Sequence, residues 1–223
     1  MDKSYSRNFL LITGAFITCL ITSNLASIKL LSFFGTIFDA GTILFPITYI
    51  FGDVLTEVYG FKKTRIIIWL GFACNFFMVL VMYLMVRLPP CIDWQGQKAF
   101  ETIFDFAPRI VIASFCAYLA GEFANSIVMS TMKKITRGRH LWTRTIGSTL
   151  VGEFIDSLIF GLIAFSSILT PWHMAVYILS QWSFKSGYEI LATPVTYKII
   201  NCLKRKEGID TFDYGVSYNP FGF

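Results

Sequence analysis

Long, uninterrupted apolar stretches constrain this 223-residue sequence more than any other feature. A helix needs about 20 residues to cross the hydrocarbon core of a bilayer, and stretches of that length recur along the whole chain. Only 15% of the residues are charged, whereas a soluble domain would have about 25%. The sequence therefore predicts an all-α integral membrane protein.

Six transmembrane helices are predicted, at approximately 8–30, 41–59, 64–88, 108–131, 146–169 and 174–200. The apolar stretch near the N-terminus is too long for a signal peptide and lacks a clear small-residue cleavage site, so we interpret it as the first span. Residues 1–207 are expected to form one six-helix transmembrane domain, and residues 208–223 an irregular cytoplasmic tail.

Basic residues predict the orientation of these spans. They gather in the second-to-third and fourth-to-fifth connections and after the last span, whereas the opposite connections have few of them or balance them with acids. The positive-inside rule then places both termini in the cytoplasm. The net charge of +5 is explained by topology and by contacts with anionic lipid headgroups, so nucleic-acid binding is not expected. The basic residues on the predicted inner side are Lys62, Lys63, Arg65, Lys133, Lys134, Arg137, Arg139, Arg144, Lys204, Arg205 and Lys206.

Polar side chains interrupt the spans on one face of each helix. A charge at the bilayer centre costs about 2.5–3.5 kcal/mol on insertion scales, so these groups should face the inside of the bundle. Stripes on at least four helices predict a shared polar cavity. The residues at helical spacing are Asp53 with Glu57, Glu122 with Asn125, Glu153 with Asp156, and Gln181 with Lys185 and Glu189; Ser23, Asn24 and Asn75 lie in spans one and three.

The predicted cavity contains many more acids than bases. Six carboxylates and Lys185 would carry a net charge of −5 if all were ionised. A low-dielectric cavity does not hold that charge, so either some carboxyls are protonated or donor-rich ligands compensate. A polar clamp between helices is the structural alternative. Interhelical hydrogen bonds of this kind average only about 0.6 kcal/mol, and a clamp would explain one pair but not six acids. It stays open for Asn24, Asn75 and Asn125.

A glycine followed by an acid occurs three times, in GDVLTE (52–57), GEFANS (121–126) and GEFIDS (152–157). The glycine either lets two helices approach closely or leaves the backbone open toward a ligand. Two of these segments lie in spans two and five, the middle helix of each half. That placement indicates a three-plus-three inverted repeat.

Four segments together resemble the YhhQ-type queuosine precursor transporters, also called the VUT family. They are FPITYIFGDVLTEVYGFKKTR (45–65), ASFCAYLAGEFANS (113–126), GSTLVGEFIDSLIFGLIAF (147–165) and FKSGYEILATPVTYKI (184–199). The resemblance covers essentially the whole chain, with the motifs in order. It implies import, across the cell (inner) membrane, of a 7-deazaguanine base for transfer RNA modification. The base would be queuine or its cyano or aminomethyl precursor, and other proteins would carry out the modification.

Acidic side chains suit such a substrate. The edge of a guanine-like base offers N1–H and an amino group, and a carboxylate accepts both in charge-assisted hydrogen bonds. We expect Glu153 and Asp156 to hold this edge, with Glu122 or Asp53 as the next candidates. Lys185 would balance their charge and could donate to the carbonyl at C6.

Secondary roles are expected for the other polar and aromatic residues of the stripes. Asn24 and Asn125 are candidate polar contacts. Glu57 and Glu189 are candidate gating or proton-relay groups, although Glu57 has an equally good interpretation as a carboxylate at the membrane surface. Candidate stacking partners are Phe45, Tyr49, Phe154, Trp182 and Tyr188.

Two other functions stay open. The chain contains no GxxxxGK[ST] segment, so it could be a substrate-binding membrane subunit that works with a separate ATPase. FGD at 51–53 has a faint similarity to intramembrane aspartyl hydrolases. Neither histidine is predicted on a span, so no metal site is expected, and no cofactor is predicted. The six-span unit could pair into a homodimer.

Overall fold

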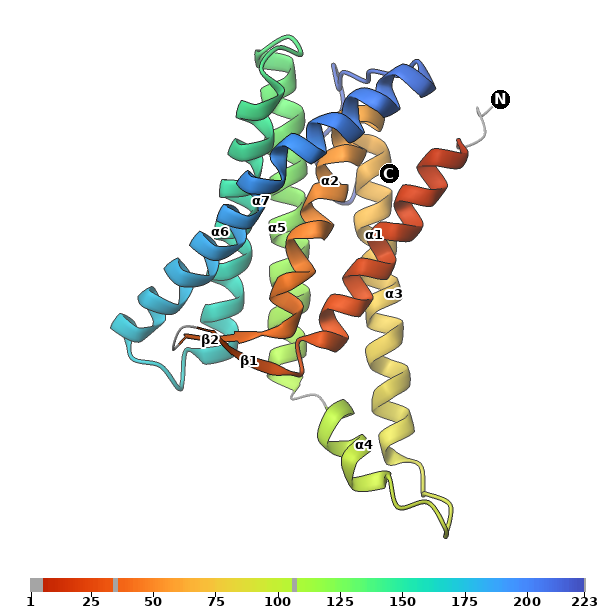
Figure 1. Ribbon diagram of the computed structural model, residues 1–223, viewed down its shortest axis with the longest axis vertical. Helices are drawn as coiled ribbons and strands as arrows, with labels where there is room; N and C mark the ends of the chain where they lie inside the picture. Colours follow the sequence, from red (N-terminus) through yellow and green to blue (C-terminus); the bar gives the residue numbers. More distant parts are fainter. Residues whose placement is uncertain (1–5, 34–35, 106–107, 223) are drawn as a thin grey trace.

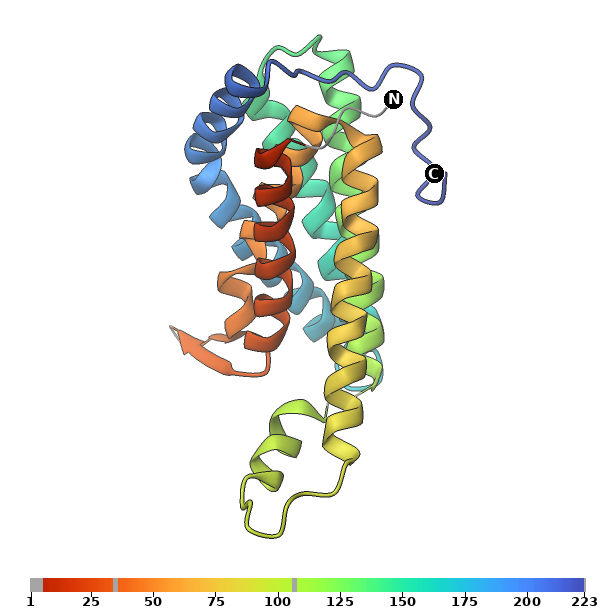
Figure 2. The ribbon, with the colours of Figure 1, turned by 90° about the vertical axis from the view of Figure 1, so that its right-hand side faces the viewer.

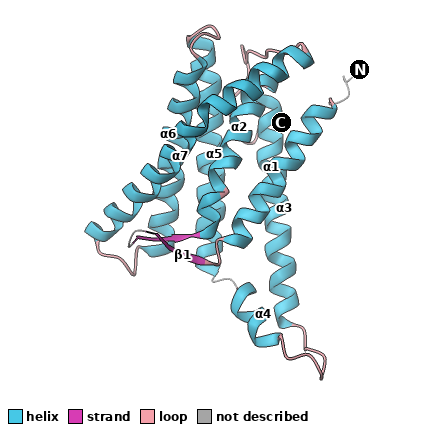
Figure 3. Ribbon diagram, in the orientation of Figure 1, coloured by secondary structure: helices cyan, strands magenta, loops and turns pink. Residues whose placement is uncertain are grey.

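The computed structural model describes residues 6–33, 36–105 and 108–222. The first five residues, which belong to the N-terminal segment predicted to be cytoplasmic, lie outside this part of the chain. The described elements are α1 (Arg7–Ala26), β1 (Leu30–Phe33), β2 (Thr36–Asp39), the short 3-10 helix η1 (Ala40–Ile43), α2 (Phe45–Tyr59), α3 (Phe61–Arg87), α4 (Gln97–Phe104), α5 (Pro108–Ile135), α6 (Leu141–Phe165) and α7 (Pro171–Glu207). Helices make up nearly the whole molecule (Figure 3).

Five helical segments in this part of the chain are long and apolar enough to cross a membrane. They are α1, η1 with α2, α3, α5 and α6. The predicted sixth span, 174–200, falls on α7, a 37-residue helix whose polar stripe makes it less apolar than the other five. The chain is therefore an α-helical membrane protein with several spans.

The bundle has two distinct ends (Figures 1 and 2). One end, here called the basic end, contains the start of α1, the α2–α3 and α5–α6 connections, and the chain after α7. The other, the hairpin end, contains β1 and β2, α4 and the α6–α7 connection. The basic side chains of the α2–α3 and α5–α6 connections and of the end of α7 thus lie at the same end of the molecule.

Local signals explain several helix boundaries. Ser6 accepts a hydrogen bond from the N–H of Phe9 and so caps α1. Pro46 lies in the first turn of α2, where its missing N–H costs no helical hydrogen bond. Between α2 and α3 the chain turns at Gly60, whose φ of 85° is unfavourable for any residue with a Cβ. Gly60 is thus the single residue between the end of α2 and the start of α3.

The connection between the first two spans differs from the sequence prediction. The first span was expected to continue to residue 30, but α1 ends at Ala26 and an antiparallel hairpin of β1 and β2 follows. Ser23 donates a hydrogen bond to the carbonyl of Gly41 (2.8 Å), which fixes the end of α1 against η1. The apolar composition of this segment suits a strand as well as a helix, so composition could not distinguish them.

The tail after α7 is irregular, as expected, but it is tied to the basic end. Asp213 is buried and accepts hydrogen bonds from the N–H of Phe61, at 3.1 and 3.0 Å, and from Ser130 at 2.5 Å. It therefore caps the first turn of α3, where a negative charge is stabilised. Farther along the tail, the carbonyl of Asn219 accepts from Arg65 (2.9 Å) and that of Pro220 from Trp69 (2.9 Å).

Candidate functional site

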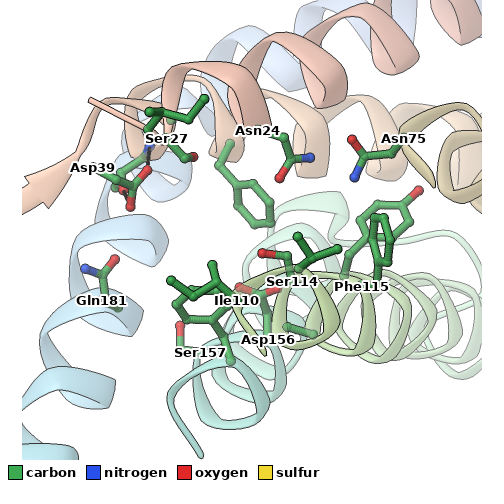
Figure 4. A pocket seen from close by; sticks show the side chains of 18 of the residues that line it. Asn24, Ser27, Asp39, Asn75, Ile110, Ser114, Phe115, Asp156, Ser157 and Gln181 are labelled. Carbon is green, nitrogen blue, oxygen red and sulfur yellow. Dashed lines mark hydrogen bonds between the residues drawn. The ribbon is translucent and has the colours of Figure 1, made fainter. Parts of the chain in front are cut away.

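A cavity of about 740 Å³ lies between the helices toward the hairpin end. This volume falls within the range of about 300–1,000 Å³ that is typical of small-molecule sites. Most of the exposed wall area is apolar, and polar groups reach the cavity from several helices, among them α1, α3, α5, α6 and α7 (Figure 4). The polar side chains lining it are Asn24, Ser27, Asp39, Thr42, Asn75, Thr102, Asp105, Ser114, Tyr118, Asp156, Ser157, Tyr177, Gln181 and Lys185.

Lys185 on α7 and two acids on α6 form an ionic centre at this cavity. The Lys185 Nζ is 2.6 Å from Asp156 Oδ2 and 3.4 Å from Glu153 Oε2. Lys185 also lies over the ring of Phe45, 4.2 Å from its centroid, at a distance that suits a cation–π interaction. Asp156, Lys185 and Phe45 line the cavity, whereas Glu153 lies fully buried behind them. One cation therefore serves two carboxylates, and the three charges sum to −1 when all are ionised.

Two glycines bring α5 and α6 together directly behind this centre. A Cβ on Gly152 would lie 2.8 Å from the Asn125 Cβ and 3.0 Å from the carbonyl oxygen of Gly121. A Cβ on Gly121 would meet the Tyr49 hydroxyl and lie 2.9 Å from the Asp156 Cβ. At these two positions the glycine–acid segments therefore provide close helix packing, which is the first of the two readings given above.

A second layer of buried polar groups separates the cavity from the basic end. Asp53 Oδ1 accepts hydrogen bonds from Asn125 (2.9 Å) and Ser148 (3.4 Å). Glu189 Oε1 accepts from Thr149 at 2.7 Å. These side chains are buried and do not line the cavity.

Glu122 and Glu153 have the fewest partners in this layer. All four of their carboxylate oxygens are buried without a hydrogen bond among the described residues, as is the hydroxyl of Tyr49, and Glu153 Oε2 has only its longer ion pair with Lys185, at 3.4 Å. Buried oxygens without a donor are unfavourable unless a ligand, water or proton satisfies them. This region therefore has capacity to accept hydrogen bonds.

Glu57 lies apart from both regions, in an ion cluster at the basic end. Arg144 donates to both of its oxygens, at 2.8 and 2.7 Å, and the Nζ atoms of Lys204 and Lys133 lie 2.5 and 3.4 Å away. Glu57 is completely buried and Arg144 is 1% exposed. The two lysines also bind Asp210 of the tail, at 2.8 and 2.5 Å.

Asp210 is partly exposed, and its charge state reflects the two lysines. Burial alone would raise its pKa, but hydrogen bonds from Lys133 and Lys204, together with their charges, hold the pKa of Asp210 below its usual value. Three cations and two carboxylates thus close the basic end.

The structure sorts the predicted site residues into three groups. Those that line the cavity are Asp156, Lys185, Asn24 and Phe45; those buried beside or behind it are Glu153, Glu122, Asp53, Asn125 and Glu189; and Glu57 lies in the ion cluster of the basic end. Tyr188 is 36% exposed and lines no part of the cavity.

Sequence reasoning missed several polar residues of the cavity wall. Ser157 lies beside the predicted stripe of α6, so helical spacing could have identified it. Gln181 and Asn75 were recognised as polar residues of their spans but were not assigned to the substrate site. Asp39 is the last residue of β2, in the unpredicted hairpin, and gave no signal in the sequence. The partners of Glu57 were interpreted only as orientation signals.

Three comparisons place the chain among known proteins. The sequence profile of the family described as "Putative vitamin uptake transporter" matches residues 39–199. The chain is 29% identical to the "Probable queuosine precursor transporter" of Bacillus subtilis (strain 168) over 178 residues, which are 79% of this chain and 78% of that protein. It is 28% identical to the protein with the same description from Haemophilus influenzae, over 74% of this chain and 70% of the relative. It is 31% identical to the "Queuosine precursor transporter" of Escherichia coli (strain K12), over 56% of this chain and 54% of that relative. No solved structure matches the chain.

Proposed function

The chain belongs to this family of vitamin uptake transporters, and we propose that it imports queuosine precursors or queuine, as 7-deazaguanine bases, for transfer RNA modification. The names of three relatives support the substrate class. Membership in a transporter family also argues against the alternative of an intramembrane aspartyl hydrolase, because the family is described by uptake of a solute.

The proposed topology has six spans with both termini in the cytoplasm of a multi-pass protein in the cell (inner) membrane. On this proposal α7 is the sixth span, and its polar stripe faces the bundle. The gathering of basic connections at the end where α1 begins and α7 ends supports the orientation. The glycine–acid segments of α2 and α6 support an inverted repeat of two three-helix halves. The cavity then opens to the outside.

The ionic centre of Lys185, Asp156 and Glu153 is the single observation that carries the binding proposal. An incoming base would present its N1–H and amino group to the Asp156 carboxylate and its C6 carbonyl to the Lys185 ammonium. Glu153 keeps the lysine charged and oriented from behind. Phe45, already against the lysine, offers an aromatic face to a flat ligand.

The proposed transport cycle alternates access between the two ends of the bundle. The cluster around Glu57, with the tail across it, would act as the inner gate, because it closes the end opposite the cavity. Asp53, Glu122 and Glu189 lie between the cavity and this gate, so they are proposed as contacts along the path, with Glu189 in the relay role. Asn125 would orient Asp53 through its hydrogen bond.

Uptake measurements test this function directly. Cells expressing the chain should accumulate labelled queuine, and both precursors should compete for uptake better than guanine. Lys185→Ala should lower uptake by about 100-fold, because the ionic centre loses its cation. Lys198→Ala is the matched control, since Lys198 is an exposed lysine on the same helix and should leave uptake unchanged. Normal uptake by a normally expressed Lys185→Ala variant would remove the ionic centre from the mechanism.

Reconstitution separates transport by the chain alone from the ATPase-partner alternative. The purified chain in liposomes should accumulate or exchange labelled queuine without any other protein. Binding of queuine without movement across the liposome membrane would instead support a binding subunit that needs a separate motor.

A further inference from the structure

Asn75 on α3 is a buried amide at the cavity for which neither the ionic centre nor the helix packing gives a role. Its side chain is 3% exposed, and its Oδ1 has no hydrogen-bond partner among the described residues. An amide in this condition is costly unless something binds it, and the cavity is the open space beside it. A clamp between helices would require a protein partner that the described part of the chain does not supply.

The position of Asn75 is fixed by its own helix. The hydroxyl of Tyr118, on α5, donates to the carbonyl of Ile68 at 3.1 Å and is buried. Ile68 lies seven residues before Asn75, so both occupy the same face of α3, which is turned toward α5. Tyr118 and Asn75 both line the cavity. The amide is therefore held by a packed helix, in a fixed position on the cavity wall.

Asn24 on α1 completes this wall. Its Nδ2 donates to the carbonyl of Leu20 at 3.0 Å, which uses one of its two N–H groups and orients the amide, and its Oδ1 is an acceptor. Figure 4 shows Asn24 and Asn75 on the wall formed by α1 and α3, across the cavity from Asp156 and Ser157 on α6. The cavity therefore has an ionic wall and a neutral amide wall.

The geometry points to Asn75 as a specificity-determining residue that reads the N3 and N9–H edge of a free 7-deazaguanine base, with Asn24 as a second acceptor. This inference rests on the proposed function. An amide combines one acceptor with donors in one plane, which complements an edge that pairs N9–H with the N3 lone pair. That edge faces a different side of the base from the N1–H assigned to Asp156, with the amino group between them, so one base can present an edge to each wall. A nucleoside has a sugar in place of the hydrogen on N9, so the amide wall selects the free base.

A pair of isosteric ligands tests the inference. The first is 7-deazaguanine, and the second is its furan analogue, in which a ring oxygen replaces the N9–H group with almost no change in shape. Binding of each to the purified chain is measured by competition against labelled queuine. The wild-type chain should bind the furan analogue at least about 10-fold more weakly, because the Asn75 oxygen loses its donor and faces another acceptor.

The variants identify the residue responsible. Asn75→Ala should weaken binding of 7-deazaguanine by about 10-fold and bring the ratio between the two ligands close to one. The ratio of the two affinities within one variant does not depend on how much of the protein is folded. Partial misfolding therefore does not affect this comparison. Asn201→Ala makes the same change at an exposed asparagine of α7 and should keep the wild-type ratio.

Two results would overturn the inference without touching the proposed function. One is equal binding of both ligands by the wild-type chain, and the other is an unchanged ratio in Asn75→Ala. A wild-type chain that binds neither ligand nor queuine would instead overturn the proposed function itself.

Discussion

The ionic centre at the cavity and the ion cluster at the basic end are built from similar side chains but have opposite balances. At the cavity, Lys185 alone serves Asp156 and Glu153, and buried acceptor oxygens remain without donors. At the basic end, Glu57 is bound on both oxygens by Arg144 and contacted by two lysines. An acid that is fully paired by the protein has no capacity left for a ligand, whereas one that shares its only cation does.

This difference separates binding from closure. Removing one partner from a fully buried, fully paired cluster leaves charge stranded in the protein interior. Removing one partner beside a cavity exposes the remaining charge to solvent or ligand, where the penalty is smaller. The two regions should therefore respond to mutation in opposite ways, one mainly in stability and the other mainly in uptake.

The largest effect is expected for Glu57→Gln. The change leaves Arg144, Lys133 and Lys204 facing one another without their central carboxylate, and it should destabilise the fold by about 3–5 kcal/mol. Thermal denaturation of the purified chain in detergent measures this loss.

Glu101→Gln, at an exposed position on α4, is the control for Glu57→Gln and should denature like the wild-type chain. A stable Glu57→Gln variant that has lost uptake would break the comparison. It would show that Glu57 is needed for the transport cycle, as a gate or relay group, and not for the stability of the cluster.

The next effect is expected for Asp156→Asn, and it should appear in uptake. The variant keeps its shape and retains the contact of Lys185 with Glu153, so we expect about 100-fold lower uptake with less than about 1 kcal/mol change in stability. Uptake of labelled queuine and thermal denaturation are measured on the same preparation. Asp93→Asn changes an exposed carboxylate between α3 and α4, outside the cavity, and serves as the control. A large loss of stability in Asp156→Asn would show that the ionic centre stabilises the fold and is not primarily a substrate-binding group.

A smaller effect is expected for Asp213→Asn in the tail. The amide keeps one acceptor for the N–H of Phe61 but loses the charge that favours the start of α3, so stability should fall by about 1 kcal/mol. Thermal denaturation again measures this, with Asp93→Asn in the connection between α3 and α4 as the control. An unchanged midpoint would mean that the tail contributes nothing to closing the basic end.

The smallest effect is the pH dependence due to Asp210. Because its pKa in the folded chain is below its usual value of 3.8, the stability it adds is present above that value. This contribution is lost as the pH falls through the lower pKa of the folded chain. Asp210→Asn should therefore lower the denaturation midpoint slightly at neutral pH and flatten the acid limb of a plot of midpoint against pH, so that the two curves converge below the folded pKa. An identical acid limb in the variant would exclude Asp210 as a source of that dependence.

Much of the helical framework could be predicted from the sequence, because the length of an apolar stretch and the charge of a connection are both visible within a short segment. The stripe spacing also predicted that α6 and α7 would bring Asp156 and Lys185 together, and the contact is present. Spacing reports which face of a helix turns inward. It does not report whether a cavity or another side chain lies in front of that face, so Glu153 and Glu122 could not be separated from Asp156.

The remaining features depend on contacts that leave little trace in the sequence. The tail binds through backbone carbonyls such as those of Asn219 and Pro220, which any residue could supply. The hairpin between α1 and α2 forms from an apolar segment with no strand-specific pattern. Arg144 had a sufficient explanation as an orientation signal, and only its contact with Glu57 shows a second role.

The contact between Gly121 and Gly152 limits how this protein can move. With backbone touching backbone, α5 and α6 have no side-chain layer along which to slide at that point. Any rocking that turns the carboxylates from one side of the membrane to the other must carry the two helices as a single lever.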